Sequence, residues 1–222
     1  MKKLLLLSAL LIFAYGCSKT TAIPDANFEQ ALINLGIDTG TVNGSVATSN
    51  IADVTDLRVN SQNISDLTGI EDFTALTLLT ANNNKLTSID LSNNTDLERL
   101  LLIRNQLKSI DLSNNTDLFS LFIADNQLTS LDVSNNTSIE LFNASKNQLR
   151  SLDFRNGNNK KIWGFDVADN PNLTCIYVNN LTYMNEKFKY KLTDYDRIVS
   201  ALTFVINETE CSALSLLDDE VN

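Results

Sequence analysis

Four aspartates at a constant spacing are the first residues in this sequence that could do chemistry. They stand 21 residues apart, at Asp90, Asp111, Asp132 and Asp153. If they occupy one position in successive repeats, neighbouring carboxylates lie about 5 Å apart and repel each other. Such a column could bind calcium. Alternatively, each carboxylate accepts N–H hydrogen bonds from the turn that follows it, as in an Asx turn.

The composition excludes several other kinds of chemistry. The 222-residue chain has no histidine, so it can use neither an imidazole base nor a histidine metal site. Its formal net charge of -10 repels nucleic-acid backbones, so we expect no nucleic-acid partner. An enzyme built from what remains would be an acid/base glycosidase that uses two carboxylates. The sequence indicates no cofactor and no resident metal.

The aspartate spacing belongs to a longer internal repeat. Each unit places apolar residues and one asparagine in the order LxxLxLxxNxLxxL, which is the leucine-rich repeat pattern. One unit has these positions at Leu76, Leu79, Ala81, Asn84, Leu86 and Ile89, and the next three units start at Leu97, Leu118 and Ile139. A degenerate unit starts at Val54 with Gln62 in place of the asparagine, and a last unit, two residues longer, starts at Ile162. The repeats therefore cover residues 54–176 in about six coils of 21 residues.

The period predicts what the coils build. The LxL segment alternates inward and outward like a strand buried on one face, and a 21-residue return path lets strands stack in parallel about 4.8 Å apart. The asparagine amide can bond the backbone of its own and adjacent turns. One coil buries too little apolar surface to fold alone, so its ends must be capped. The predicted fold class is a leucine-rich repeat solenoid, α/β or mainly β, with a curved parallel sheet.

The N-terminal side of the repeats carries the signals of a helical cap, over residues 23–53. Asp25 is a candidate N-cap, and Gly36 stands where the helix would end in a left-handed turn. Between them, apolar residues recur at helical spacing, at Phe28, Ala31, Leu32 and Leu35.

The C-terminal side, residues 177–211, is a mixed apolar segment that we expect to cover the last coil. Cys175 precedes it and Cys211 ends it. In an exported protein two such thiols are expected to form a disulfide, and two buried free thiols are the alternative. Residues 212–222 are acidic and are expected to be a flexible tail.

The first residues indicate export. Lys2 and Lys3 precede an apolar run that is too short to span a bilayer, so residues 1–16 are expected to be a signal peptide. The segment AYGC at 14–17 resembles the bacterial lipoprotein box, which implies lipidation of Cys17 and a tether over residues 17–22. Ser18, where some lipoproteins have aspartate, implies sorting to the outer membrane, facing the periplasm or the surface. An ordinary secretory signal, and hence a secreted protein, is the alternative.

Residues 23–211 also resemble a known group as a whole. The segments IPDANFEQALINLG, ISDLTGIEDFTAL and NPNLTCI, with the SNNT repeats, are similar to short leucine-rich repeat lipoproteins and secreted proteins of flavobacteria and other Bacteroidetes, and less closely to internalins. The resemblance implies the fold, export and a binding role, but no particular ligand.

The outward side chains of the predicted concave sheet are the candidate binding site. Apolar residues gather there in the central coils, at Leu78, Leu101, Ile103, Phe122 and Leu141, and Arg58 and Arg99 flank them. An exposed contiguous apolar patch is usually an interaction site. The alternatives are an error in the strand register, which would turn some of these residues inward, and hydrophobic residues that are merely tolerated on the surface.

The leading functional hypothesis is a non-catalytic envelope lipoprotein that binds a protein or glycan through its repeats and contacts the membrane only through its lipid anchor. The alternatives are a structural envelope component without a specific ligand and the carboxylate-based glycosidase.

Overall fold

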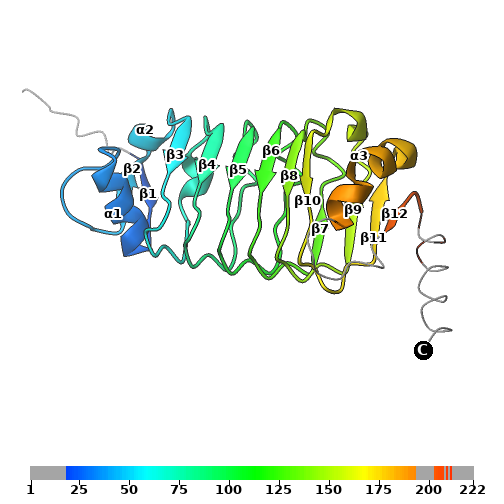
Figure 1. Ribbon diagram of the computed structural model, residues 1–222. Coiled ribbons are helices and arrows are strands. Elements are labelled where there is room, and N and C mark those ends of the chain that lie inside the picture. Colours follow the sequence, from blue (N-terminus) through cyan, green and yellow to red (C-terminus); the bar gives the residue numbers. More distant parts are fainter. Residues whose placement is uncertain (1–18, 194–202, 208, 210, 212–222) are drawn as a thin grey trace, which may run out of the picture.

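The computed structural model describes residues 19–193, 203–207, 209 and 211, which form an elongated solenoid (Figure 1). The expected signal peptide, Cys17 and the tail at 212–222 lie outside these residues. In chain order the elements are β1 (Thr20–Ala22), α1 (Ala26–Asn34), β2 (Ser45–Ala47), α2 (Thr48–Ile51), β3 (Asp56–Arg58), η1 (Ile70–Asp72), β4 (Leu78–Thr80), β5 (Arg99–Leu101), β6 (Ser120–Phe122), β7 (Ser130–Asp132), β8 (Leu141–Asn143), β9 (Ser151–Phe154), η2 (Asn159–Lys161), β10 (Gly164–Asp166), β11 (Cys175–Val178), α3 (Leu181–Thr193) and β12 (Thr203–Val205).

The main sheet is the one that the LxL segments predict. Its six strands pair in parallel in the order β10-β8-β6-β5-β4-β3. The paired positions Asp56, Leu78, Arg99, Ser120, Leu141 and Gly164 lie side by side, so each coil takes 21 to 23 residues. The leucine-rich repeat solenoid with about six coils is therefore confirmed.

The core runs along the solenoid axis behind this sheet. The central residue of each strand points inward and is at most 8% exposed, at Leu57, Leu79, Leu100, Leu121, Phe142 and Phe165. A second buried residue follows each strand, for example Leu102 after β5 and Ile123 after β6. Stacked coils thus share one continuous apolar core, which a single coil could not form.

The asparagine of the repeat connects each coil to the one before it. The Asn105 amide donates to the carbonyl of Ala81 at 2.9 Å in the preceding coil and to that of Leu102 at 3.1 Å in its own, while its oxygen accepts from the Leu86 N–H. Asn84, Asn126, Asn147 and Asn170 bond the backbone in the same way. These bonds satisfy buried polar groups at the tight bend, as the sequence predicts.

Gln62 does not join this ladder. Its side chain is exposed, and the backbone N–H groups of Gln62 and Ile64 instead donate to the oxygen of Asn84 in the next coil. The backbone of the first coil is therefore hydrogen-bonded by the asparagine of the second coil.

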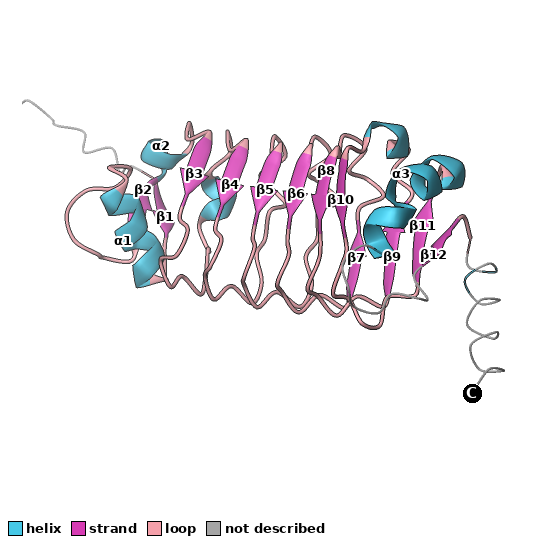
Figure 2. Ribbon diagram, viewed as in Figure 1, coloured by secondary structure: helices cyan, strands magenta, loops and turns pink. Residues whose placement is uncertain are grey.

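A second parallel sheet, with strand order β12-β11-β9-β7, lies on the return path of the last coils and was not predicted (Figure 2). The residue after the repeated aspartate changes from Leu91 and Leu112 to Val133 and Phe154 at the point where this sheet begins. Branched and aromatic side chains favour extended backbone, which accounts for strands in these coils and not in the earlier ones.

The N-terminal cap consists of β1, α1, β2 and α2. Asp25 caps α1 as predicted, since its side chain accepts from the N–H groups of Asn27 and Phe28, and Gly36 adopts a φ of 72° after the helix. Residues 20–22, which the sequence assigned to the tether, form β1 and pair antiparallel with β2. The ordered cap therefore begins closer to Cys17 than expected.

The C-terminal cap consists of α3 and β12, which packs beside β11. The predicted disulfide joins Cys175 and Cys211 with a Cα–Cα distance of 5.9 Å, and so is confirmed. No helix in the described ranges is both long and apolar enough to cross a membrane.

Candidate partner-binding surface

The outward side chains of the main sheet form two rows in register. The first row is Asp56, Leu78, Arg99, Ser120, Leu141 and Gly164, and the second is Arg58, Thr80, Leu101, Phe122, Asn143 and Asp166. This alternation is the one that the repeat template predicts for a strand buried on one face.

The centre of this face is apolar. Leu101 and Phe122 are direct neighbours on β5 and β6, and both side chains are half-buried. Ile103, two residues after Leu101, is also half-buried. Leu78 faces outward too, but its neighbours cover it and leave it 8% exposed, so it offers little surface to a partner.

Leu141 extends this apolar surface toward β10. A Cβ atom added to Gly164 would lie 2.6 Å from Cδ2 of Leu141, so the glycine makes room for the leucine side chain to lie across β10. The half-buried Leu141 therefore covers the end of the first row as well as its own position.

The two arginines expected to flank the patch differ. Arg58 donates twice to Asp56, from Nε at 2.9 Å and from Nη2 at 2.7 Å, so its charge is already paired. Arg99 is exposed, and no salt bridge involving it is found among the described residues. Arg99 is the better candidate for pairing with an acidic group of a partner.

Two aromatic residues beside the patch were missed by the sequence analysis. The residues that immediately precede the strands form a row, which we name the leading edge, through backbone bonds such as those from Glu140 to the carbonyl of Phe119 and from Trp163 to that of Glu140. Phe119 is half-buried and Trp163, the single tryptophan, is 57% exposed. Their positions hold threonine or glutamate in other coils, which is the signal that could have revealed them.

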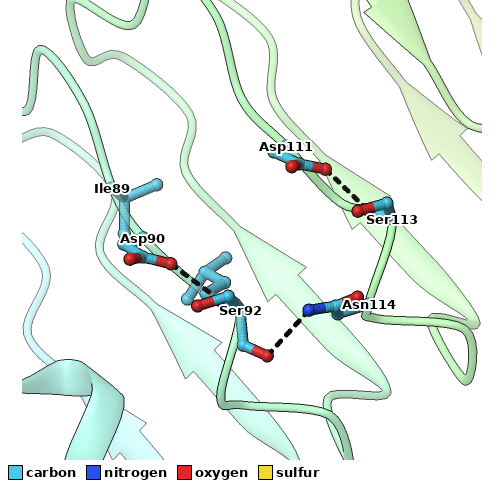
Figure 3. A pocket seen from close by; sticks show the side chains of 7 residues that line it. Ile89, Asp90, Ser92, Asp111, Ser113 and Asn114 are labelled. Atoms are coloured by element: carbon cyan, nitrogen blue, oxygen red, sulfur yellow. Dashed lines mark hydrogen bonds between the residues drawn. The ribbon is translucent and has the colours of Figure 1, made fainter.

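The aspartate column lies on the return path, away from this surface. The carboxylates of Asp90, Asp111, Asp132 and Asp153 each accept from the backbone N–H two residues later, at 2.8–3.1 Å. Figure 3 shows the first two of these contacts, at Ser92 and Ser113. The backbone bond from Ser92 lowers the pKa of Asp90, and that from Ser113 lowers the pKa of Asp111. The geometry matches the local turn role.

A shallow polar groove of about 380 Å³ runs between two of these turns and is lined by Asp90, Ser92, Asp111, Ser113 and Asn114 (Figure 3). In the part of the chain that the structure describes, no three acidic or cysteine side chains gather as metal ligands. The groove therefore presents hydrogen-bonding groups without a preformed cation site.

Comparison with solved structures places the fold. The functional domain of InlJ from Listeria monocytogenes is 28% identical with a TM-score of 0.63, over 72% of this chain and 38% of that one. The internalin inlF of the same species is 19% identical with a TM-score of 0.49, over 82% and 68% of the two chains. The leucine-rich repeat ectodomain of the receptor kinase SOBIR1 from Arabidopsis thaliana is 18% identical with a TM-score of 0.48, over 71% and 98%.

The chain thus spans about two fifths of the InlJ structure that it resembles. That domain includes a cysteine ladder, whereas the buried ladder described above is built from asparagine. A family model described as the LVIVD repeat matches residues 121–144, which is a single coil. The comparison with curated proteins gave no match.

The chain is therefore a leucine-rich repeat solenoid that is structurally similar to internalins. Solenoids of this class generally act as binding domains, and they typically bind proteins through their extended concave surface. The disulfide favours an extracellular or envelope location, where disulfides persist.

Proposed function

We propose that the chain is a non-catalytic lipoprotein of the cell envelope, anchored through Cys17 in the outer membrane, whose concave face binds a protein partner. The observation that carries the proposal is the apolar patch of half-buried side chains at the centre of the main sheet, formed by the paired residues Leu101 and Phe122 with Ile103 and Leu141. The lipoprotein box at residues 14–17 supports the anchor.

The size of the face sets the expected strength of binding. Six strands about 4.8 Å apart span about 24 Å, and three residues along each strand cover about 10 Å. The flat area of the face is therefore about 240 Å², short of the roughly 800 Å² that each partner buries in a standard interface. Every 100 Å² of apolar surface covered contributes about 2.5 kcal/mol before the costs of association. A partner confined to the four apolar residues would bind weakly. One that also covers Phe119 and Trp163 on the leading edge would bind more tightly.

The polar groups around the patch favour a protein over a glycan. Arg99 lies two residues before Leu101 on the same strand, and Asn143 and Asp166 continue the row of Leu101 and Phe122. A protein segment with apolar side chains flanked by an acidic group would match both features, since desolvated apolar anchors supply most binding energy and charges supply orientation.

Site-specific photocrosslinking in cells tests this function. A crosslinking residue in place of Phe122 in the full-length protein should capture a discrete partner, whereas the same residue in place of the exposed Lys108, on the return path, should not. Adding Leu101→Ser should lower the yield from position 122, with Lys108→Ser as the matched control. Equal capture from both positions, or an unchanged yield with Leu101→Ser, would move the partner away from the concave face.

A further inference from the structure

Residues 20–52, at the N-terminal end of the solenoid, carry no exposed charge. Between residues 20 and 52 the charged residues are Asp25, Glu29 and Asp38, and they are 9%, 0% and 8% exposed. In a chain with 27 acidic residues and a net charge of -10, a stretch of this length without an exposed charge is exceptional. It begins directly after Lys19, whose ammonium is exposed apart from a 3.4 Å contact with Asp72.

Each buried acid has its carboxylate turned toward the protein. The two oxygens of Glu29 accept from the N–H groups of Asn43 at 2.6 Å and Gly44 at 2.7 Å. Asp25 holds the start of α1 and the turn at Ser65, and Asp38 accepts from the N–H of Thr39. The charges thus fix the backbone of the cap from inside and leave its outer surface neutral.

The same end exposes apolar side chains. Of the four large hydrophobic residues that are exposed in the described chain, two lie here, Leu35 at 49% and Val42 at 40%. They stand at the two ends of the loop that follows α1 and leads to β2, and this loop forms the outermost part of the solenoid at the left of Figure 1. Ile33 and Ile37 beside Leu35 are half-buried. The loop is therefore a neutral, partly apolar rim.

The position of Cys17 indicates what covers this end. Because β1 starts at Thr20, only two residue steps separate Cys17 from Lys19, which is at most about 7 Å of extended chain. A lipid on Cys17 would bring the N-terminal cap to the headgroups and leave no room for a partner domain between them. Neutral polar and apolar side chains suit the interfacial region of a bilayer, and a lysine at its edge suits anionic headgroups.

We propose that the charge-free end of the N-terminal cap docks on the phospholipid surface, with Leu35 and Val42 in the interfacial region and Lys19 beside the phosphates. The proposal rests on the lipidation of Cys17 proposed above. Two apolar side chains orient an anchored domain and are too few to hold it alone. Docking by this end points the rest of the solenoid away from the bilayer and leaves the concave patch accessible. Trp163, which directly precedes β10, then lies far from the lipid, because β10 is five strands away from β3 in the main sheet.

Accessibility of a fluorophore in proteoliposomes tests the docking. The full-length lipidated protein is reconstituted in vesicles of phosphatidylethanolamine and phosphatidylglycerol, with a dithionite-sensitive label on Thr41→Cys in the loop or on Lys108→Cys in the middle of the solenoid. Both parent side chains are exposed, and Cys175 and Cys211 are held in the disulfide. Dithionite should reduce the label at 41 several-fold more slowly than the label at 108. Adding Leu35→Asp and Val42→Asp should abolish that difference while the protein stays in the vesicles.

The single tryptophan supplies an independent control of orientation. Brominated lipids should leave the fluorescence of Trp163 unquenched, because end-on docking keeps it away from the bilayer. Quenched Trp163 would mean that the solenoid lies on its leading edge, which overturns the proposal.

The remaining outcomes separate the docking from the anchor. Equal reduction at 41 and 108 in protein retained by the vesicles overturns the docking and leaves the lipid anchor standing. Protection at 41 that disappears when the protein is diluted in lipid points to a second copy of the chain and also overturns it. Protein without an acyl group and not retained by vesicles overturns both proposals.

Discussion

At each end of the solenoid a cap covers the edge of the terminal coil, but different interactions hold the two caps in place. At the N-terminal end, a buried carboxylate, Asp25, and a half-buried one, Asp72, tie the cap to the first coil. Asp25 reaches Ser65 and Asp66, and Asp72 accepts from the hydroxyl of Thr21 at 2.5 Å. At the C-terminal end the cap is held by aromatic packing and one disulfide, together with hydrogen bonds from Tyr183 and Lys187 to the carbonyl of Ile162. We call the carboxylate contacts of the N-terminal end polar clamps. Their strength depends on the protonation state of the carboxylates, whereas that of aromatic packing does not.

The aromatic cluster has Phe165 at its centre. Its ring centroid lies 5.2–6.1 Å from those of Phe142, Phe154, Phe188 and Phe204, which come from β8, β9, α3 and β12. The cluster thus joins the main sheet, the second sheet and the cap through one side chain. The C-terminal end should therefore unfold in one cooperative step, while the carboxylate contacts of the N-terminal end should break one after another.

The largest effect is expected from Phe165→Ala. Removing the central ring leaves a cavity bordered by four other rings and should cost about 4 kcal/mol of unfolding free energy. Phe119→Ala, which removes a half-buried ring outside the cluster, is the matched control and should cost much less. Denaturant unfolding measures both. Similar losses in the two variants would show that the cluster is not what holds this end.

The next effect concerns the disulfide. The bond closes a loop of 36 residues, and the chain-entropy relation gives about 3 to 4 kcal/mol for such a loop. The Cys175→Ala, Cys211→Ala double variant should lose that stability and should exchange amide hydrogens faster in β11 and β12 than in β1 and β2. Faster exchange at both ends alike would contradict the separation of the two caps.

Much of this architecture was predictable because the repeat is periodic. The ladder asparagines, the inward residues of the main sheet and Asp25 as the N-cap all follow from spacing and residue type. The residue before each ladder asparagine has a φ of 55–57°, yet at Arg104 and Lys146 the residue type carries no sign of a left-handed conformation. There the stacking of neighbouring coils determines the backbone.

The candidate surface was less predictable, because exposure depends on neighbouring side chains. Leu78 has the outward position of its coil but is covered, whereas Leu141 is spread across β10 by the lack of a side chain at Gly164. The pairing of Arg58 with Asp56 and the exposure of Trp163 likewise depend on the folded arrangement. The repeat template predicts which way each side chain points, but not how much of its surface remains accessible.

At the N-terminal end the strongest test is Glu29→Ala. The carboxylate is fully buried, and its loss leaves the N–H groups of Asn43 and Gly44 without their acceptor, which should cost about 3 kcal/mol. Glu98→Ala, at an exposed position on the leading edge, is the control and should be nearly neutral. Hydrogen exchange should accelerate in β2 and leave β11 unchanged. A uniform change along the solenoid would mean that the two ends are not independent.

The smallest expected effect is a pH dependence confined to the N-terminal end, at Asp25. Burial alone would raise the pKa of this carboxyl, but hydrogen bonds from the side chain and backbone of Ser65 and from the N–H groups of Phe28 and Asp66 lower it below its usual value. Because the pKa is lower in the folded state, the ionised carboxylate contributes its full stability above the unfolded pKa of about 4 and loses it as the pH falls through the folded pKa.

Acidification below about pH 4 should therefore accelerate hydrogen exchange in α1 before it does so in the phenylalanine cluster, which has no group to protonate. Asp25→Asn replaces one accepting oxygen by a donor that faces the N–H groups of Ser65 or Asn27. It should cost about 1 to 2 kcal/mol at neutral pH and remove the acid sensitivity of α1. If α1 in the Asn variant kept the acid response of the parent, the sensitivity would have to come from other carboxylates, and the polar clamp at Asp25 would not be what distinguishes the two ends.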